Sequence, residues 1–243
     1  MIRKKLGILG GMGPYAGEFF FRLVTEHTKA ERDADHIDAV MTSTASTPDR
    51  SAYISDPSKK NPFAAIEKDV KTLVFGGAEI IALPCNTACC FIDNIAAVSS
   101  VPVINMIKET VKCAKISGAR KIGIFATEGT VAFGKYQSEC RAVGIEPVVP
   151  DNDTQTVITE SIYRKIKAGN RKVNEIYPEI DKYLSYCDAV VFGCTELSLI
   201  DVSQERYIDK IIDSTQVLAI RSIFECGARP INFDKIYERY VML

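Results

Sequence analysis

The 243-residue chain has little histidine, almost no net charge and no long apolar run. Its two histidines, His27 and His36, lack the spacing of metal ligands, so the sequence predicts no metal site built on histidine. Lysine and arginine number 30 against 31 aspartates and glutamates, a formal net charge of -1. Such a balance gives no overall field that recruits nucleic acid or an anionic membrane. We therefore expect a small-molecule partner.

No apolar run approaches the ~20 residues that a membrane span needs. The amino-terminal segment 1–10 opens with basic residues, but glycines interrupt its apolar stretch too early for a signal-peptide core. We therefore expect a cytoplasmic protein whose eight cysteines are free thiols. The hydrophobic fraction of 47% is ample for a packed core.

Short apolar runs alternate with segments of helical periodicity along the chain. Helices are predicted at 16–30, 62–75, 107–116, 156–168 and 173–185, and strands at 37–42, 101–104 and 144–149. Further strands are expected to begin at Lys5 and Lys121 and to lead up to Cys85 and Cys194. This alternation predicts an α/β protein of parallel sheets with helices on both faces.

Two pairs of segments indicate an internal duplication. The strand and glycine loop at Ile8 resemble those at Ile124, 116 residues later (124 minus 8). The apolar run that ends at Cys85 resembles the run that ends at Cys194, 109 residues later (194 minus 85). Nearly equal offsets predict two homologous halves with a binding cleft between them, at the carboxyl ends of their strands.

Cys85 and Cys194 are the principal candidates for chemistry. A pair of thiols in equivalent loops suits proton removal from one face of a carbon and proton return to the other. A free cysteine has a pKa of ~8.5, and a helix amino terminus after each cysteine is expected to lower that pKa. Polar neighbours then orient the thiols or hold the ligand: Asn86, Thr87, Thr195 and Glu196.

Two other interpretations compete with the thiol pair. Cys89 and Cys90 follow Cys85 closely, and this clustering suggests a metal or redox site, although the paired Cys-x-x-Cys spacing of zinc sites is absent. The segment 11–16 matches the G-x-G-x-x-A form of a dinucleotide-binding loop. Pro14 weakens that match, because it removes a backbone donor where a pyrophosphate needs one.

Two cations are candidates for substrate binding. Arg50 lies in a polar loop that follows a predicted strand, where a guanidinium is able to hold a carboxylate through two parallel hydrogen bonds. Lys167 lies near the end of a predicted helix, just before Gly169, and is either a partner of the helix dipole or a second cation in the cleft.

Five segments together resemble the aspartate/glutamate racemase family, and specifically its cofactor-independent aspartate racemase branch. They follow the order of the family and span nearly the whole chain: Gly10-Gly11-Met12-Gly13-Pro14, Thr47-Pro48-Asp49-Arg50, Pro84-Cys85-Asn86-Thr87-Ala88, Ile166-Lys167-Ala168-Gly169 and Gly193-Cys194-Thr195-Glu196.

The resemblance implies two pseudo-symmetric, doubly wound α/β domains, a site in the interdomain cleft and a homodimer. Residues 1–107 with a returning helix at 213–227 form one half, residues 108–212 form the other, and residues 228–243 extend the carboxyl end. It also implies racemisation of aspartate, with glutamate as an alternative, without any cofactor. Other activities of the superfamily, such as hydantoin racemisation or maleate isomerisation, and a non-catalytic amino-acid-binding module stay open.

By the same resemblance, Cys85 and Cys194 are the two bases, and Arg50 and Lys167 favour a dicarboxylic substrate. The remaining substrate contacts are implied at Met12, Gly13, Asn86, Thr87, Thr127, Thr130 and Thr195. One departure concerns Cys89, which stands where relatives of this branch commonly have a histidine.

Overall fold

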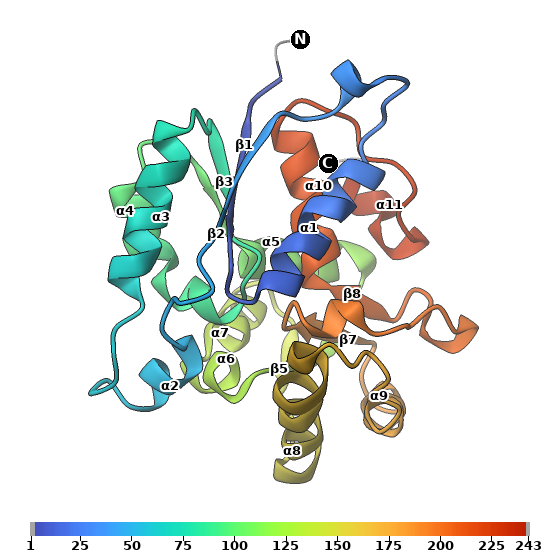
Figure 1. Cartoon of the computed structure of the whole chain (residues 1–243). Coiled ribbons are helices and arrows are strands. Elements are labelled where there is room, and N and C mark those ends of the chain that lie inside the picture. Colours follow the sequence, from blue (N-terminus) through green and yellow to red (C-terminus); the bar gives the residue numbers. More distant parts are fainter. Residues whose placement is uncertain (1–2, 242–243) are drawn as a thin grey trace.

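The structure is a computed structural model that describes residues 3–241. Two parallel sheets of four strands each organise the chain (Figure 1). The first has the order β2-β1-β3-β4, with β1 at Leu6–Gly10, β2 at Ala39–Ser43, β3 at Ile80–Ala82 and β4 at Val103–Ile104. The second has the order β6-β5-β7-β8, with β5 at Lys121–Ala126, β6 at Glu146–Val148, β7 at Ala189–Gly193 and β8 at Ile211–Asp213.

The two sheets have the same strand order once each strand of the first half is matched to its counterpart in the second. All pairings are parallel. The residues of β1 and β7 are buried throughout, as expected of strands covered on both faces. The predicted architecture of two doubly wound α/β halves is therefore confirmed.

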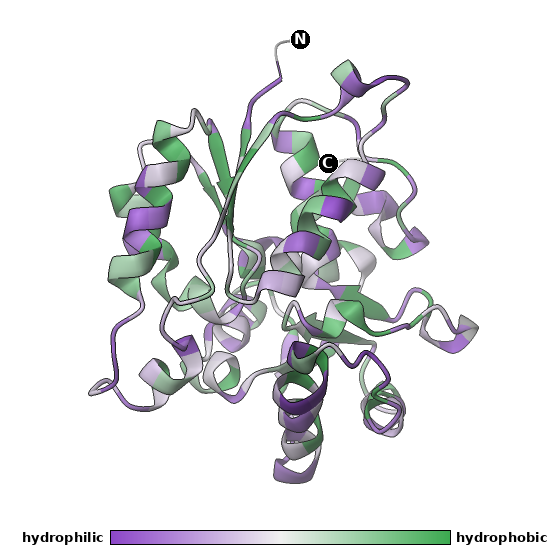
Figure 2. Cartoon of the chain, viewed as in Figure 1, coloured by the Kyte–Doolittle hydropathy of each residue, from purple (hydrophilic) through white to green (hydrophobic). Residues whose placement is uncertain are grey.

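Helices flank both sheets. In Figure 1, α3 and α4 lie on one side of the first sheet, and α1 and α10 lie on the other. Figure 2 shows apolar strands enclosed by helices whose polar residues gather on the outer faces, the pattern of amphipathic helices. The bounds are α1 Pro14–Glu26, α2 Arg50–Ser55, α3 Phe63–Phe75, α4 Ile92–Val98, α5 Met106–Ser117, α6 Glu128–Phe133, α7 Lys135–Ala142, α8 Asn152–Glu160, α9 Ile176–Leu184, α10 Ser214–Glu225 and α11 Lys235–Val241.

Local signals in the sequence explain the ends of α5. The Asn105 side chain accepts a hydrogen bond from the backbone N–H of Lys108 and caps the amino terminus. Gly118 ends the helix with a φ of 90°, a left-handed conformation that glycine adopts without strain. The helix predicted at 107–116 and its closure by Gly118 are confirmed.

The helix predicted at 156–168 differs from the observed structure. Asp151 caps α8 through the backbone N–H of Thr154, so the helix begins four residues earlier, at Asn152. Beyond Glu160 the chain widens into a π-helical turn, Ser161–Lys165, and then tightens into a 3-10 turn, Ile166–Ala168. The next helix, α9, begins at Ile176 rather than 173, because the chain after the left-handed Gly169 is irregular over 170–173 and turns at 174–175.

The carboxyl-terminal segment packs on the helices next to the sheets. The hydroxyl of Tyr237 on α11 accepts a hydrogen bond from the backbone N–H of Asp213, and the hydroxyl of Tyr240 donates to Glu109 on α5. The expected extension at 228–243 is thus part of the packed structure as far as residue 241, and residues 242 and 243 lie outside the described part. Between residues 3 and 241, no helix is long and apolar enough to cross a membrane.

Candidate functional site

One small cavity collects side chains from both halves of the chain. Loops after β1, β3, β5 and β7 contribute to it, so it lies at the carboxyl ends of the central strands. Most of the residues predicted for the site line this cavity, whose full lining is Met12, Asp49, Arg50, Ser51, Cys85, Asn86, Thr87, Thr127, Tyr163, Lys167, Cys194, Thr195 and Glu196.

Cys85 follows β3 and is 5% exposed, with Arg50 as its cationic neighbour. The Arg50 guanidinium is itself buried and donates hydrogen bonds to the backbone carbonyls of Met12, at 3.0 Å, and Pro48, at 3.1 Å. Burial acts to lower the pKa of Arg50, but the negative charge of Cys85 and then that of Asp49 raise it overall. The fork of Arg50 is therefore fixed by the backbone and directed toward one of the two thiols.

Cys194 follows β7 and has a carboxylate as its neighbour. Its thiol donates a hydrogen bond to Glu196 Oε2 at 3.1 Å, and Glu196 is itself only 4% exposed. Burial, followed by the charge of Glu196, raises the pKa of the Cys194 thiol well above its ordinary value. The expectation that a helix amino terminus lowers this pKa is wrong. Only a short 3-10 turn, Leu197–Leu199, follows Cys194, and the nearby carboxylate opposes ionisation.

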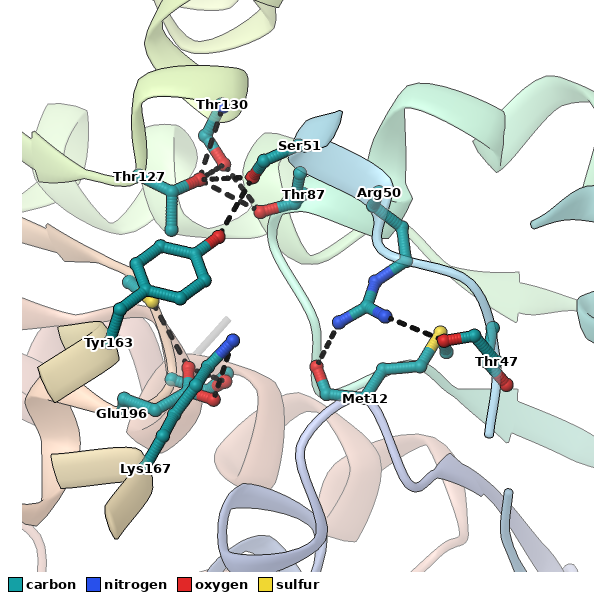
Figure 3. Close-up of polar contacts among 12 residues, drawn as sticks. Met12, Thr47, Arg50, Ser51, Thr87, Thr127, Thr130, Tyr163, Lys167 and Glu196 are labelled. Atoms are coloured by element: carbon teal, nitrogen blue, oxygen red, sulfur yellow. Dashed lines mark hydrogen bonds and ion pairs between the residues drawn. The ribbon is translucent and has the colours of Figure 1, made fainter. Parts of the chain in front are cut away.

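Lys167 and Tyr163 complete the surroundings of Glu196. Lys167 Nζ lies 3.9 Å from Glu196 Oε1 and 4.2 Å from the centre of the Tyr163 ring. Burial acts to lower the pKa of Lys167, but Glu196 and then Tyr163 raise it overall. Lys167 therefore lies in the cleft as a cation. Figure 3 shows Arg50 with Met12 on one side of the site and Lys167 with Tyr163 and Glu196 on the other.

Three threonine hydroxyls meet at the boundary between the two halves. Thr87 Oγ1 lies 3.0 Å from Thr127 Oγ1 and 2.9 Å from Thr130 Oγ1, and the last two oxygens lie 3.0 Å apart. Thr127 also caps α6, which fixes its position, and all three side chains are buried. A triangle of hydroxyls whose hydrogens rotate suits a carboxylate, which accepts several hydrogen bonds at once.

Ser51 and Tyr163 were not among the residues predicted for the site. Ser51 Oγ donates to Thr127 Oγ1 at 3.4 Å and accepts from the Tyr163 hydroxyl at 3.2 Å (Figure 3). This short chain of hydroxyls joins α2 of the first half to the π-helical turn of the second. Ser51 adjoins the predicted Arg50, whereas Tyr163 enters the cleft from a π-helical turn that the sequence does not signal.

The glycine loop of the first half contacts the acidic side of the site. A Cβ atom on Gly13 would lie 3.1 Å from Glu196 Oε1, so a side chain at this position would require a small shift of the carboxylate. Met12 is 4% exposed, and its carbonyl accepts the hydrogen bond from Arg50. The buried carboxylate of Glu196 lies next to this loop and would repel the negative charge of a pyrophosphate, which argues against the dinucleotide interpretation.

Cys89 and Cys90 lie near Cys85 without forming a metal site. Cys89 is 1% exposed, and its thiol donates to the backbone carbonyl of Cys85 at 3.5 Å. Burial, and then the charge of Cys85, raises the pKa of Cys90 to about 12 and that of Cys89 higher still. Among residues 3–241, no group of three or more His, Cys, Asp or Glu side chains is placed to hold a metal ion.

The two buried thiols, Cys85 and Cys194, therefore line one cavity of a fold built from two similar α/β halves. The family model Asp/Glu/Hydantoin racemase matches residues 9–221. The chain belongs to this family, and it is therefore a racemase, an enzyme of the isomerase class.

The names of individual relatives specify different substrates. The chain is 31% identical to the broad specificity amino-acid racemase RacX of Bacillus subtilis (strain 168), over 88% of this chain and 94% of that protein. Aspartate racemase from Picrophilus torridus superposes with a TM-score of 0.85 at 30% identity, over 98% of both chains. Glutamate racemase of Aquifex pyrophilus is 27% identical over 59% of this chain and 57% of that protein.

Proposed function

We propose that the protein racemises aspartate, with glutamate as a second possible substrate, by a two-base mechanism that needs no cofactor. The observation that carries this proposal is the pair of buried thiols, Cys85 and Cys194, at equivalent strand ends of the two halves and in one cavity. A substrate held between them presents opposite faces of its α-carbon to the two sulfurs. Relatives named for aspartate and for amino acids in general support the substrate class.

The reaction balances with one thiolate and one thiol. The thiolate removes the α-proton, and its sulfur becomes a thiol while the electron pair of the C–H bond passes to the substrate carbanion. The opposite thiol then gives its proton to the other face of that carbon and becomes a thiolate. Hydrogen bonds and cations around the carboxylates stabilise the carbanion, since no electron sink is invoked.

The surroundings of the two thiols support different roles for them in the resting enzyme. Burial and then the Glu196 carboxylate raise the pKa of the Cys194 thiol, which makes Cys194 the proton donor of the pair and leaves the role of base to Cys85, the neighbour of Arg50. One ionised and one neutral sulfur are the combination that the mechanism requires. The first enantiomer to react is thus the one that presents its α-proton to Cys85.

The polar groups of the cleft suit a dicarboxylic amino acid. We assign one carboxylate to the cavity-lining hydroxyls of Thr87 and Thr127, which Thr130 contacts from outside the cavity, and the second to the cations Arg50 and Lys167. The cavity has a volume of only ≈ 10 Å³, about the space of one water molecule. Substrate entry therefore requires this cavity to widen, and the hydrogen bond from Tyr163 to Ser51, two residues of its lining, is one contact whose loss would widen it.

We further propose the division of the chain into halves at 1–107 with 213–227 and at 108–212, and a homodimer in the cytoplasm. The packing of α10 against α1 supports its return to the first half. The state of the cysteines supports a reducing compartment, since all eight are free.

Exchange of the α-proton with solvent tests the proposed activity. Purified protein in deuterated water, without added cofactor, is expected to place deuterium on the α-carbon of aspartate, measured by NMR or mass spectrometry. Deuterium in glutamate as well would widen the substrate range. Stabilisation of the protein by aspartate without any exchange would instead identify a binding module and contradict the proposal.

Replacement of Glu196 by glutamine is expected to move the alkaline limb of the pH–rate profile to lower pH. Activity falls at high pH when Cys194, the proton donor of the resting enzyme, loses its proton. Glutamine preserves the hydrogen-bonding geometry but removes the negative charge that helps to raise the pKa of Cys194, so this pKa falls. Glu146→Gln, a change at an exposed carboxylate, is the control and should leave the profile in place. An unchanged or upward-shifted limb in Glu196→Gln would contradict the assignment.

A further inference from the structure

Tyr136 lies beneath the candidate site, outside the cavity lining. It comes from α7 of the second half and is fully buried. Its ring packs on the backbone directly before Cys194, since a Cβ atom added to Gly193 would lie 3.0 Å from Tyr136 Cε2. The absence of a side chain at Gly193 is thus what allows the ring to reach the Cys194 loop.

The hydroxyl of Tyr136 reaches the other thiol loop. It donates a hydrogen bond of 2.6 Å to Oδ1 of Asn86, the residue that follows Cys85. Asn86 Nδ2 in turn donates to Ser214 Oγ at 2.9 Å, so the Asn86 amide is held at both ends. Burial raises the pKa of Tyr136 far above its ordinary value, and the phenol therefore stays a neutral donor across the working pH range.

Ser214 connects Asn86 to the loop that carries the second thiol, Cys194. Its hydroxyl donates to the backbone carbonyl of Phe192 at 2.7 Å, two residues before Cys194. Every side chain in this chain of contacts is buried, where a lost hydrogen bond leaves its partner unsatisfied. Tyr136, Asn86 and Ser214 therefore form one polar bridge between the loops that carry the two thiols.

We propose that Tyr136 is a positioning residue that holds the two thiol loops in register and fixes the orientation of Asn86 beside Cys85. This inference rests on the proposed two-base function and extends it to a residue that touches no substrate. The contacts divide the role in two. The ring supports the Cys194 loop by packing, and the hydroxyl supports the Cys85 loop by a hydrogen bond.

This division predicts an effect that a merely structural residue would not produce. Tyr136→Phe keeps the ring on Gly193 but leaves Asn86 Oδ1 without its donor, so the disturbance falls on the Cys85 loop. Proton transfer at Cys85 is expected to slow by about 10- to 100-fold, because small displacements of a catalytic group cost that much. Proton transfer at Cys194 should change little.

Racemisation cannot separate the two bases, since its rate requires both, but elimination can. From threo-3-chloroaspartate, one thiolate takes the α-proton, chloride leaves with the C–Cl electron pair, and the resulting enamine tautomerises and hydrolyses to oxaloacetate and ammonium. Each enantiomer uses one base only. The Cys194→Ala variant identifies the enantiomer that Cys85 deprotonates, because that elimination persists without Cys194.

The experiment compares oxaloacetate release from both enantiomers by wild type, Tyr136→Phe and Tyr183→Phe. Tyr183 is a matched control: it is 1% exposed, its ring packs against an aromatic ring in the second half, and its hydroxyl bonds the backbone at Asp151 and Val149, away from the thiols. Selective slowing of the enantiomer that Cys85 deprotonates, by Tyr136→Phe alone, supports the proposal. Equal slowing of both enantiomers, or no difference from Tyr183→Phe, overturns it.

A second variant covers the case in which Tyr136→Phe does not fold. Ser214→Ala removes the bonds to both Asn86 and the carbonyl of Phe192, and it is expected to slow both eliminations. Ser222→Ala, a buried serine of the same helix that bonds only the carbonyl of Leu218, should slow neither. If the Ser214→Ala variant eliminates chloride from both enantiomers as fast as Ser222→Ala does, the polar bridge does not position the thiol loops and the proposal is overturned. A wild type that neither racemises aspartate nor eliminates chloride overturns the proposed function itself, which is a distinct result.

Discussion

Replacement of Cys85 or of Cys194 by alanine is expected to lower the rate of aspartate racemisation by at least about 10³-fold, because a positioned acid or base contributes on that scale. Neither thiol is able to serve both faces of the α-carbon, so each single variant should lose inversion in both directions. Loss of optical rotation of each pure enantiomer, followed over time, measures the effect. The two variants should fold normally, since each substitution removes one sulfur from a cavity wall.

Cys187→Ala is the matched control for this experiment. Cys187 is buried in the second half, as Cys194 is, but it does not line the cavity. Burial, its principal influence, raises its pKa to about 11, so it is an inert thiol at neutral pH. Its variant should keep near-normal activity. A Cys85 or Cys194 variant that racemises as fast as the Cys187 variant would exclude the two-base mechanism.

Arg50→Lys is expected to reduce kcat by about 10²-fold or more, on the scale of removing one preorganised donor from a transition state. Lysine keeps the charge but loses the planar fork that reaches the carbonyls of Met12 and Pro48 while facing Cys85. Both the cation beside Cys85 and the position of the Met12 loop therefore change. Steady-state kinetics with each enantiomer gives the result.

Arg22→Lys provides the comparison, because Arg22 is exposed on α1 and its guanidinium packs over the Phe19 ring away from the cavity. It should behave as the wild type. An Arg50→Lys variant with unchanged kcat and only a raised KM would show that the Arg50 guanidinium contributes equally to binding of substrate and transition state, and it would contradict a role of Arg50 in the reaction at Cys85.

The architecture was predictable because each half repeats a local pattern that physics constrains strongly. The all-apolar run of β1 and its counterpart β5 have to be buried on both faces, which requires parallel strands with flanking helices. Nearly equal offsets for Ile8 with Ile124 and for Cys85 with Cys194 then indicated two halves. The common strand order confirms that division of the fold into two similar sheets.

The ends of the helices that border the cleft were less predictable, because tertiary contacts decide where these helices begin and end. Apolar spacing from Thr156 suggested one helix to Ala168, yet a cap at Asp151 and a π-helical turn reshape that segment. The turn places Tyr163 against Ser51 of the other half, a contact between residues 112 positions apart. No local pattern in the sequence signals such a pairing, and the same holds for the contacts of Tyr136 with Asn86 and Gly193.

The electrostatics of the two thiols also depended on tertiary structure. Glu196 was predicted as a polar neighbour of Cys194, but the sequence does not tell whether its carboxylate faces the sulfur or the solvent. In the structure, the Glu196 carboxylate accepts a hydrogen bond from the Cys194 thiol and, after burial, raises its pKa, whereas Cys85 has the Arg50 cation as its neighbour. The two halves are therefore similar in fold but opposite in charge around their thiols.

The position of deuterium after brief reaction in deuterated water tests the central claim most directly. Each pure enantiomer of aspartate is incubated with the enzyme, the reaction is stopped at low conversion, and the α-deuterium content of both enantiomers is measured after chiral separation. Two thiols on opposite faces predict deuterium in the product enantiomer and almost none in the remaining substrate, because the donating thiol carries a solvent-derived deuteron. Comparable deuterium in the recovered substrate would mean that one group serves both faces, and it would contradict the account.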